Sequence, residues 1–338
     1  MVTTITIGAT AMIDSFGRPI TYLRVSVTDR CNLRCFYCMA DDPDFLPRSD
    51  ILGIEELERL CQVFIRLGVR KIRLTGGEPL VRRGIMDLLR PLGKEIAAGR
   101  LRELCLTTNG TQLARFAPEL AEAGVKRVNV SLDSLDADIF RRITRGGDLT
   151  QVLNGLAVAR EAGLTVKINT VALKGVNDQG FDDLISWCGD RGFDMALIEA
   201  MPLGGLAERR ASQYLPLDEV RQRLARRWTL VPSDYRSDGP ARYWDIAETG
   251  RRLACIEAMS HCFCASCNRV RLTAAGMLNL CLGQPDSVSL RPLLRNHESD
   301  EALKNAILAA IERKPKSHDF IAAGAMPISF RQMYQTGG

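Results

Sequence analysis

The feature that most constrains the fold is a sixfold alternation of strand-like and helix-like segments between about residues 20 and 204. The strand-like segments are short and apolar, and they cover residues 21–27, 71–77, 101–110, 125–134, 164–173 and 193–204. Helical spacing of apolar residues lies between them, over residues 54–68, 84–98, 115–124, 151–163 and 181–192. Pro91 is expected to kink or split the second helix. This alternation is typical of parallel βα units.

Six units are fewer than the eight of a closed barrel, so we predict an α/β fold with a partial (β/α)6 TIM-like barrel. The alternation stops near residue 205, where a polar, Arg-rich segment begins, and shorter strand-like runs and one helical segment follow. We therefore expect two domains, the barrel over residues 1–205 and a smaller α+β part over residues 206–338 that covers the open side. Polar or Gly-rich residues end every predicted strand, and the site is expected at that rim.

Composition narrows the function classes. The 338 residues are 46% apolar and 25% charged, so a sizeable core can form without disulfides. No run approaches the roughly 18 to 20 apolar residues that span a bilayer, and the N-terminus lacks the pattern of a secretory signal. We predict a cytoplasmic protein with no membrane partner. The net charge of +5 is mild, which favours a small anionic substrate and argues against a nucleic-acid partner.

Eleven cysteines in a reducing compartment point to metal ligands. Cys31, Cys35 and Cys38 follow the first strand with the spacing C-x3-C-x2-C. Three thiolates suit three irons of a [4Fe-4S] cluster and leave the fourth iron open for a ligand or a reaction. A zinc site or three structural thiols are the alternative. Zinc would require a fourth Cys or His, and the nearest histidine in the sequence is His261.

A second cysteine group has the spacing C-x2-C-x13-C, at Cys264, Cys267 and Cys281. It suggests another cluster with an open iron, although Cys262 could complete a four-Cys zinc or iron site. Arg269 and Arg271 follow on one face of a predicted strand, where two guanidinium groups suit an anion. Four further cysteines lie in apolar runs and are expected to be buried small hydrophobic residues: Cys61, Cys105, Cys188 and Cys255.

The first cysteine group, with an aromatic residue before its last ligand, resembles the radical SAM superfamily. The segment 74–79, LTGGEP, resembles the superfamily motif that holds the methionine amino group of S-adenosylmethionine. The resemblance implies that S-adenosylmethionine chelates the fourth iron and that Tyr37 packs near its adenine. Glycines at the motif allow a close approach of backbone to ligand, and Glu78 places a negative charge near an ammonium group.

The C-terminal segment CASCNRVRL resembles the MoaA family, the GTP 3′,8-cyclases of molybdenum cofactor biosynthesis. The resemblance extends over nearly the whole chain, including DSFGRPITYLRVSVTDRCNLRCFYCM, TGGEPLVRR, LTTNGTQL, VNVSLDSLD and KPKSHDF. It implies a lyase with two [4Fe-4S] clusters and S-adenosylmethionine. The expected reaction converts GTP to (8S)-3′,8-cyclo-7,8-dihydroguanosine 5′-triphosphate. A radical SAM peptide maturase with an auxiliary cluster is the alternative enzyme, and a metal-bound regulator or nucleic-acid binder is the alternative outside catalysis.

The family resemblance also implies residue roles. Its S-adenosylmethionine positions match Tyr37, Gly77, Ser131 and Met201. Its GTP positions match Arg24, Arg73, Thr107, Lys167, Arg269, Val270 and Arg271, with Lys71 and Asn109 as further candidates for nucleotide and S-adenosylmethionine respectively. The terminal Gly337 and Gly338 are expected to reach the active site. Some members carry an Arg where this chain has Ala196, which removes one expected phosphate contact.

The partners follow from the resemblance alone. We expect GTP as substrate, an external electron donor, a homodimer, and transfer of the product to a cyclic pyranopterin monophosphate synthase. No catalytic base is assigned, because the only three histidines lie outside the strand-end loops: His261, His297 and His318.

Overall fold

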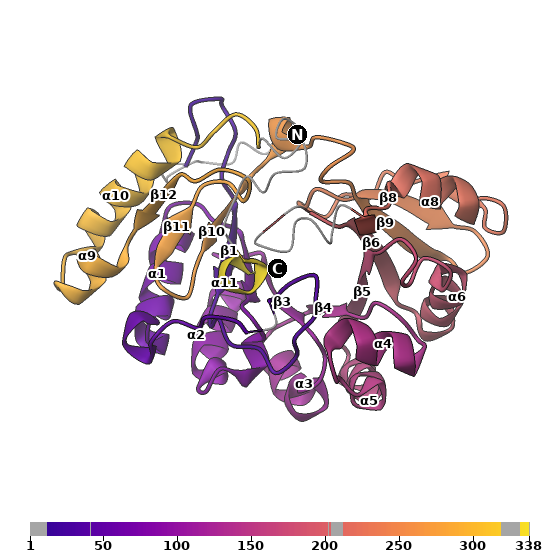
Figure 1. Ribbon diagram of the computed structural model, residues 1–338. Coiled ribbons are helices and arrows are strands. Elements are labelled where there is room, and N and C mark those ends of the chain that lie inside the picture. Colours follow the sequence, from indigo (N-terminus) through magenta and orange to yellow (C-terminus); the bar gives the residue numbers. More distant parts are fainter. Residues whose placement is uncertain (1–11, 41, 202, 204–211, 319–331, 338) are drawn as a thin grey trace.

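The computed structural model describes residues 12–40, 42–201, 203, 212–318 and 332–337. A single curved sheet runs through it in the order β12-β11-β10-β1-β2-β3-β4-β5-β6-β9-β8-β7 (Figure 1). Its central six strands are parallel neighbours in sequence order: β1 (Tyr22–Ser26), β2 (Lys71–Thr75), β3 (Glu103–Thr108), β4 (Arg127–Ser131), β5 (Thr165–Ala172) and β6 (Asp194–Glu199). This confirms the predicted partial (β/α)6 barrel.

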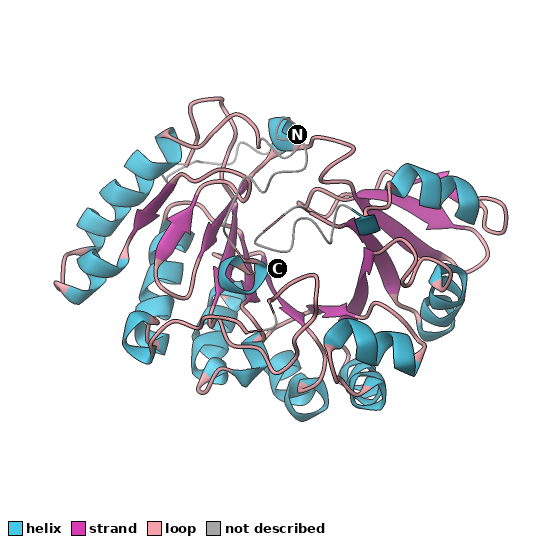
Figure 2. Ribbon diagram, viewed as in Figure 1, coloured by secondary structure: helices cyan, strands magenta, loops and turns pink. Residues whose placement is uncertain are grey.

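Helices cover the outer face of the sheet (Figure 2). They are α1 (Ile54–Arg66), α2 (Ile85–Ala97), α3 (Leu113–Glu122), α4 (Ala137–Thr144), α5 (Leu149–Glu161) and α6 (Phe181–Arg191). Helix α2 continues through Pro91, because the buried face that includes Leu88, Leu89 and Leu92 holds it against the sheet. Helix α4, which the sequence pattern did not separate from α5, begins at the Asp136 cap.

The C-terminal strands extend both edges of the sheet. On one edge, β9 (Arg251–Ile256) pairs in parallel with β6 and is followed outward by β8 (Arg242–Ile246) and β7 (Leu230–Pro232). On the other, β10 (Arg269–Leu272) pairs in parallel with β1 and is followed by β11 (Met277–Asn279) and β12 (Ser287–Ser289). The C-terminal part therefore flanks the open side of the barrel from two directions (Figure 1).

Shorter elements complete the chain. The C-terminal helices are α8 (Leu217–Leu224), α9 (Arg291–Arg295), α10 (Asp300–Glu312) and α11 (Met333–Thr336). Single 3-10 turns occur at Arg48–Asp50, Pro79–Val81 and Cys264–Ser266. Among the helices described, none is long and apolar enough to cross a bilayer.

Candidate functional site

The inner face of the sheet carries a row of cationic side chains. The parallel register places Arg271 of β10 beside Arg24 of β1, and Arg24 beside Arg73 of β2. The row continues through Cys105 of β3 to Arg127 of β4. Because residues that are paired across parallel strands point to the same face, four guanidinium groups gather on one side of the sheet.

This row lines a cavity that we name the cationic cavity, which encloses about 1260 Å³ including its solvent-filled mouth. The thiols of the second cysteine group line it as well: Cys264, Cys267 and Cys281. Its cationic lining residues are Arg24, Arg73, Arg127, Lys167, Arg269, Arg271 and Lys314, and Val270 also contributes. No carboxylate belongs to the lining that the structure describes. The cavity is therefore built for an anion.

Burial and repulsion destabilise the charged forms of Lys167, Arg24 and Arg271 in the ligand-free protein. Burial, followed by repulsion from Arg73 and Arg127, lowers the pKa of Lys167 to about 7. Burial lowers the pKa of Arg24 to about 10, and burial together with repulsion from Arg24 and Arg269 lowers that of Arg271 further. In the described part of the chain, the buried Nε atoms of Arg73, Arg127 and Arg269 have no hydrogen-bond partner. A bound polyanion would satisfy these donors and remove the repulsion.

Lys71 lies one layer away from this row. The register pairs Lys71 with Tyr22 and Glu103, and its ammonium group forms a salt bridge of 2.7 Å with Glu103. It also donates to the Ser237 carbonyl oxygen at 2.9 Å. Lys71 is thus already paired and does not line the cationic cavity.

A second cavity, the thiol cavity, adjoins the first. All of the residues matched to S-adenosylmethionine line it, together with the first cysteine group: Tyr37, Gly77, Ser131, Met201, Cys31, Cys35 and Cys38. Thr107 also lines this cavity, and in that respect it differs from the other positions matched to GTP. The two cavities share four lining residues, Asn169, Ile198, Met201 and Met333, so molecules bound in them would lie next to each other.

Gly77 brings two backbone segments into direct contact. A Cβ atom at this position would lie 2.2 Å from the carbonyl oxygen of Arg30, in the loop that leads to the first cysteine. The amide of Gly77 donates to the Thr28 carbonyl oxygen at 2.7 Å, and that of Glu78 donates to the Arg30 carbonyl oxygen at 2.8 Å. Only glycine therefore allows the second strand end to pack against the cysteine loop.

Glu78 is buried behind this contact and its carboxylate is held by the protein. Its oxygens accept hydrogen bonds from the Leu80 amide at 3.0 Å, the Thr108 hydroxyl at 2.8 Å and the Asn109 amide at 2.6 Å. Burial raises the pKa of Glu78 to about 7, and these hydrogen bonds partly oppose the rise. The side chain of Asn109 in turn lies 3.7 Å from the Cys31 sulfur. Glu78 thus positions the strand end beside the cysteines.

Tyr37 is fixed by a residue that sequence reasoning missed. Its hydroxyl donates to Asp133, just beyond β4, at 2.8 Å. Asp133 also accepts from the Val171 amide at 2.8 Å, and burial raises its pKa to about 6. The polar end of the fourth strand was a signal for such a residue, but nothing in the sequence linked it to Tyr37.

The arrangement of the thiols distinguishes between kinds of metal site. A single zinc ion with Zn–S bonds of about 2.3 Å would draw its ligand atoms close together. Neither cysteine triad forms a group whose ligand atoms all lie within 4.8 Å of one another, and neither does the four-Cys set that includes Cys262. Iron–sulfur clusters distribute their ligands over several irons, so the thiols that bind one need not meet this limit. Burial raises the pKa of Cys31 to about 11 and that of Cys35 further, which disfavours bare thiolates.

The remaining cysteines behave as predicted, since Cys61, Cys105, Cys188 and Cys255 are all buried. The C-terminus also reaches the site. Gly337 accepts a hydrogen bond from Arg271 through its carbonyl oxygen and lies against Thr75, where a Cβ atom would be 2.0 Å from the hydroxyl. Gly338 lies outside the described residues.

Sequence reasoning missed several lining residues. Arg127 and Asn129 stand four and two positions before Ser131 on β4, and Asn169 stands two positions after Lys167 on β5. The two-residue period of a strand could have identified all three. Tyr243 accepts a 3.0 Å hydrogen bond from the Lys167 ammonium group and donates to Ser237 at 2.7 Å. No local signal links Tyr243 to Lys167, because they are far apart in the sequence.

Comparison with known proteins agrees with this geometry. Residues 25–188 match the family model of the radical SAM superfamily, and residues 193–320 match the model described as Molybdenum Cofactor Synthesis C. A GTP 3′,8-cyclase of Sinorhizobium medicae is 58% identical over 97% of this chain and 95% of its own length. One of Brucella canis is 58% identical over 97% of this chain and 96% of its own length.

The solved structure of Streptococcus suis SuiB is similar with a TM-score of 0.59 and 15% identity, over 89% of this chain and 68% of its own. At that identity the likeness concerns the fold alone. The relatives with 58% identity over nearly full length, together with the two family models, show more than the fold. The chain belongs to the GTP 3′,8-cyclase family of radical SAM enzymes.

Proposed function

We propose that this chain converts GTP to (8S)-3′,8-cyclo-7,8-dihydroguanosine 5′-triphosphate, the first step of molybdenum cofactor biosynthesis. The observation that carries the proposal is the shared wall between a thiol-lined cavity and a cationic cavity. A radical generated in one cavity would meet a nucleotide held in the other without crossing solvent. The 58% identity to proteins named GTP 3′,8-cyclase favours a nucleotide over a peptide substrate.

The thiol cavity would hold a [4Fe-4S] cluster on Cys31, Cys35 and Cys38, with S-adenosylmethionine beside it. When bound, the reduced cluster and S-adenosylmethionine supply a carbon-centred radical able to remove a hydrogen atom from a sugar. The protein's part is to position and to exclude water. Gly77, Tyr37, Ser131 and Met201 would bind S-adenosylmethionine, and Asp133 would orient Tyr37 through its 2.8 Å hydrogen bond.

The cationic cavity would hold GTP. We propose that Arg24, Arg73, Lys167, Arg269 and Arg271 bind the nucleotide, with Val270 and Thr107 completing the family set. The buried Nε donors of Arg73 and Arg269 support a phosphate ligand, because planar guanidinium groups match phosphate oxygens. A second [4Fe-4S] cluster on Cys264, Cys267 and Cys281 would bind the guanine end, and the presence of all three thiols in the lining of the cationic cavity supports this role.

The wider setting is part of the same proposal. We propose a division near residue 205 between the barrel and the C-terminal part, an external electron donor, a homodimer, and a cyclic pyranopterin monophosphate synthase as recipient of the product. The end of the strand–helix alternation supports the division near residue 205. Family resemblance supports the other three statements.

An anaerobic assay tests the function. Protein reconstituted with iron and sulfide, dithionite, S-adenosylmethionine and GTP is expected to yield the cyclised nucleotide and 5′-deoxyadenosine. The same mixture with ATP in place of GTP serves as control and should give no cyclised product. Sustained cleavage of S-adenosylmethionine with no product from GTP would contradict the substrate assignment.

A further inference from the structure

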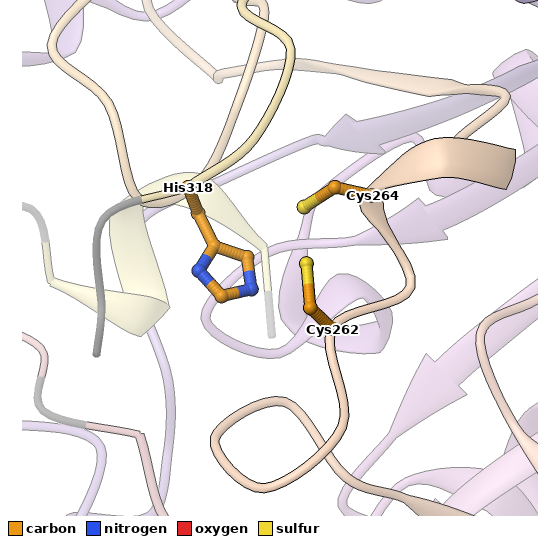
Figure 3. Close-up of side chains that lie close together, drawn as sticks. All are labelled: Cys262, Cys264 and His318. Atoms are coloured by element: carbon orange, nitrogen blue, oxygen red, sulfur yellow. The ribbon is translucent and has the colours of Figure 1, made fainter. Parts of the chain in front are cut away.

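A third group of potential metal ligands lies beside the second cysteine triad. Cys262, Cys264 and His318 converge, and one ligand atom from each lies within 4.8 Å of the others (Figure 3). We name this group the CCH site. It is the only group of three or more His, Cys, Asp or Glu side chains with that spacing in the described part of the chain. The iron–sulfur roles proposed above use Cys264 but give no role to Cys262 or His318.

Buried contacts hold the two halves of the CCH site together. The guanidinium group of Arg18 donates to the Cys264 carbonyl oxygen at 2.8 Å and, on the other side, to the carbonyl oxygens of Pro315 and Lys316 at 2.7 and 2.8 Å. A salt bridge of 2.6 Å to Asp14 fixes Arg18 in turn. Arg18 thus ties the segment that carries His318 to the cysteine loop.

A second anchor acts just before His318. Lys314 is 2% exposed, and its ammonium group donates to the Leu280 carbonyl oxygen at 2.6 Å, next to Cys281. The ring of Phe263, between the two cysteines, stacks edge-to-face on that of His318 with centroids 6.4 Å apart. The ligand atoms therefore converge in a preorganised frame, which lowers the cost of binding an ion.

The ligand set selects the class of ion. Two thiolates and one imidazole suit a borderline-soft divalent ion that accepts tetrahedral geometry, and Zn²⁺ fits this description best. Cys262 is exposed whereas Cys264 is buried, so the site opens to solvent on one side and leaves the fourth position for water. We propose that the CCH site binds Zn²⁺ when Cys264 is not ligated by iron.

A consequence concerns the second cluster and rests on the function proposed above. Cys264 belongs to both ligand sets, and a thiolate that binds as a terminal ligand serves only one metal at a time. Zn²⁺ at the CCH site and an iron–sulfur cluster at Cys264, Cys267 and Cys281 therefore exclude each other. The loop at 262–267 would thus carry one of two metals, according to which one reaches it first.

Cobalt binding tests the CCH site itself, with Co²⁺ as the spectroscopic probe for zinc. The full chain with Cys31, Cys35 and Cys38 changed to Ser is prepared without iron, so that the first triad contributes no ligand. We expect one Co²⁺ per chain, with thiolate charge-transfer and tetrahedral d–d bands. Cys262→Ser and His318→Ala should each weaken binding by about tenfold or more. Cys267→Ser is the matched control and should leave binding unchanged.

The converse pattern would overturn the proposal. If Co²⁺ affinity falls in Cys267→Ser but not in Cys262→Ser or His318→Ala, the metal is bound by the cluster ligands and not by the CCH site. Absence of tetrahedral bands in the parent chain would also overturn it. Cys262 is exposed, so its replacement by Ser is not expected to impair folding.

The iron content of the chain separately tests whether Zn²⁺ at the CCH site and the second iron–sulfur cluster exclude each other. In the same background, reconstitution should give about four irons per chain, and Zn²⁺ added beforehand should reduce this to nearly none. Cys262→Ser should keep about four irons with or without zinc. Unchanged iron in the zinc-treated parent chain would overturn the exclusion. Failure to bind four irons without zinc would instead contradict the second cluster of the proposed function, and the cobalt result would still decide the CCH site.

Discussion

Lys167 shows how burial prepares a single residue for an anion. It is 7% exposed, and the charged groups that affect its pKa lie on several strands: Arg73, Arg127, Asp194 and Lys71. Its ammonium group also donates to the Tyr243 hydroxyl. Burial is the largest cause of the low pKa, and repulsion from Arg73 comes next. A lysine with a pKa of about 7 is only partly charged at neutral pH. An anionic ligand would restore the full charge.

The affinity for GTP should therefore depend on pH. Below pH 7 Lys167 is already protonated in the free protein, so it adds no pH dependence. Above pH 7 binding must take up a proton, and the affinity should fall by up to about tenfold per pH unit. Calorimetry at pH 6.5 to 8.5 measures the trend, and Lys167→Arg is the control because arginine stays charged. If the affinity of Lys167→Arg for GTP falls with pH as steeply as that of the parent chain, Lys167 is not the source of the pH dependence.

A second prediction at the residue scale concerns Gly77, whose close contact with the cysteine loop shapes the thiol cavity. A methyl group at this position would collide with the Arg30 carbonyl oxygen, so Gly77→Ala must displace the cysteine loop or the strand end. We expect cleavage of S-adenosylmethionine to fall by about a hundredfold, because small misplacements of reacting groups have effects of this size. Gly180→Ala is the matched control, since its nearest neighbour would be 3.6 Å away and its φ is negative. Equal cleavage rates in the two variants would rule out the steric argument.

At the scale of elements, side chains from neighbouring strands pack together around Ala196. This residue of β6 is fully buried and packs in a small cluster with Ala241, Tyr243 and Ala254. The small alanines leave room for the Tyr243 ring, whose hydroxyl binds Lys167 at 3.0 Å. Arginine at residue 196 would need the space that this ring occupies. We propose that Tyr243 provides a contact to the cationic cavity in place of the arginine that the family resemblance led us to expect at residue 196.

Restoring that arginine should destabilise the protein. Ala196→Arg places a long charged side chain in a filled site, and we expect the free energy of unfolding to fall by about 1–3 kcal/mol. Val231→Arg places the same side chain at a half-exposed position of β7, where the change should stay within about 0.5 kcal/mol. Urea unfolding of both variants measures the difference. A stable Ala196→Arg variant with tighter GTP binding would contradict this expectation. It would show that the side chains packed around residue 196 can move apart and let the arginine contact a phosphate group.

At the scale of the whole molecule, the sheet brings two distant cysteine groups to adjoining cavities. The first group follows β1, and β1 pairs in parallel with β10. In the second group, Cys264 and Cys267 precede β10, and Cys281 follows β11. Asn169, Ile198, Met201 and Met333 line both cavities. A radical generated in the thiol cavity would therefore lie next to a target bound in the cationic cavity.

The two cysteine groups should be separable by mutation. We expect about eight irons per reconstituted chain and about four after either triad is changed to Ser. Loss of Cys31, Cys35 and Cys38 should abolish cleavage of S-adenosylmethionine, whereas loss of Cys264, Cys267 and Cys281 should leave cleavage but abolish the cyclised product. Iron analysis and chromatography of the nucleosides measure both effects. A chain that still forms product without the second triad would contradict a role for it in placing GTP.

Much of this molecule is determined by local sequence. The six βα units follow from the alternating periods of apolar residues, and both cysteine groups follow from ligand spacing within short loops. The two arginines of β10 could likewise be chosen from the two-residue period of a strand. Each of these features is encoded within a few neighbouring residues, which is why one chain without a structure suffices to predict it. Arg24 of β1 and Arg73 of β2, in contrast, were predicted from the family resemblance.

Only the tertiary structure decided how distant segments meet. Pairing of β10 with β1 aligned Arg271 with Arg24, and pairing of β9 with β6 brought the C-terminal strands to both edges of the sheet. The links from Tyr37 to Asp133, from Lys167 to Tyr243, and from Cys264 to His318 also join segments far apart in sequence. Strand register and side-chain packing depend on the whole core, so no local pattern encodes these contacts.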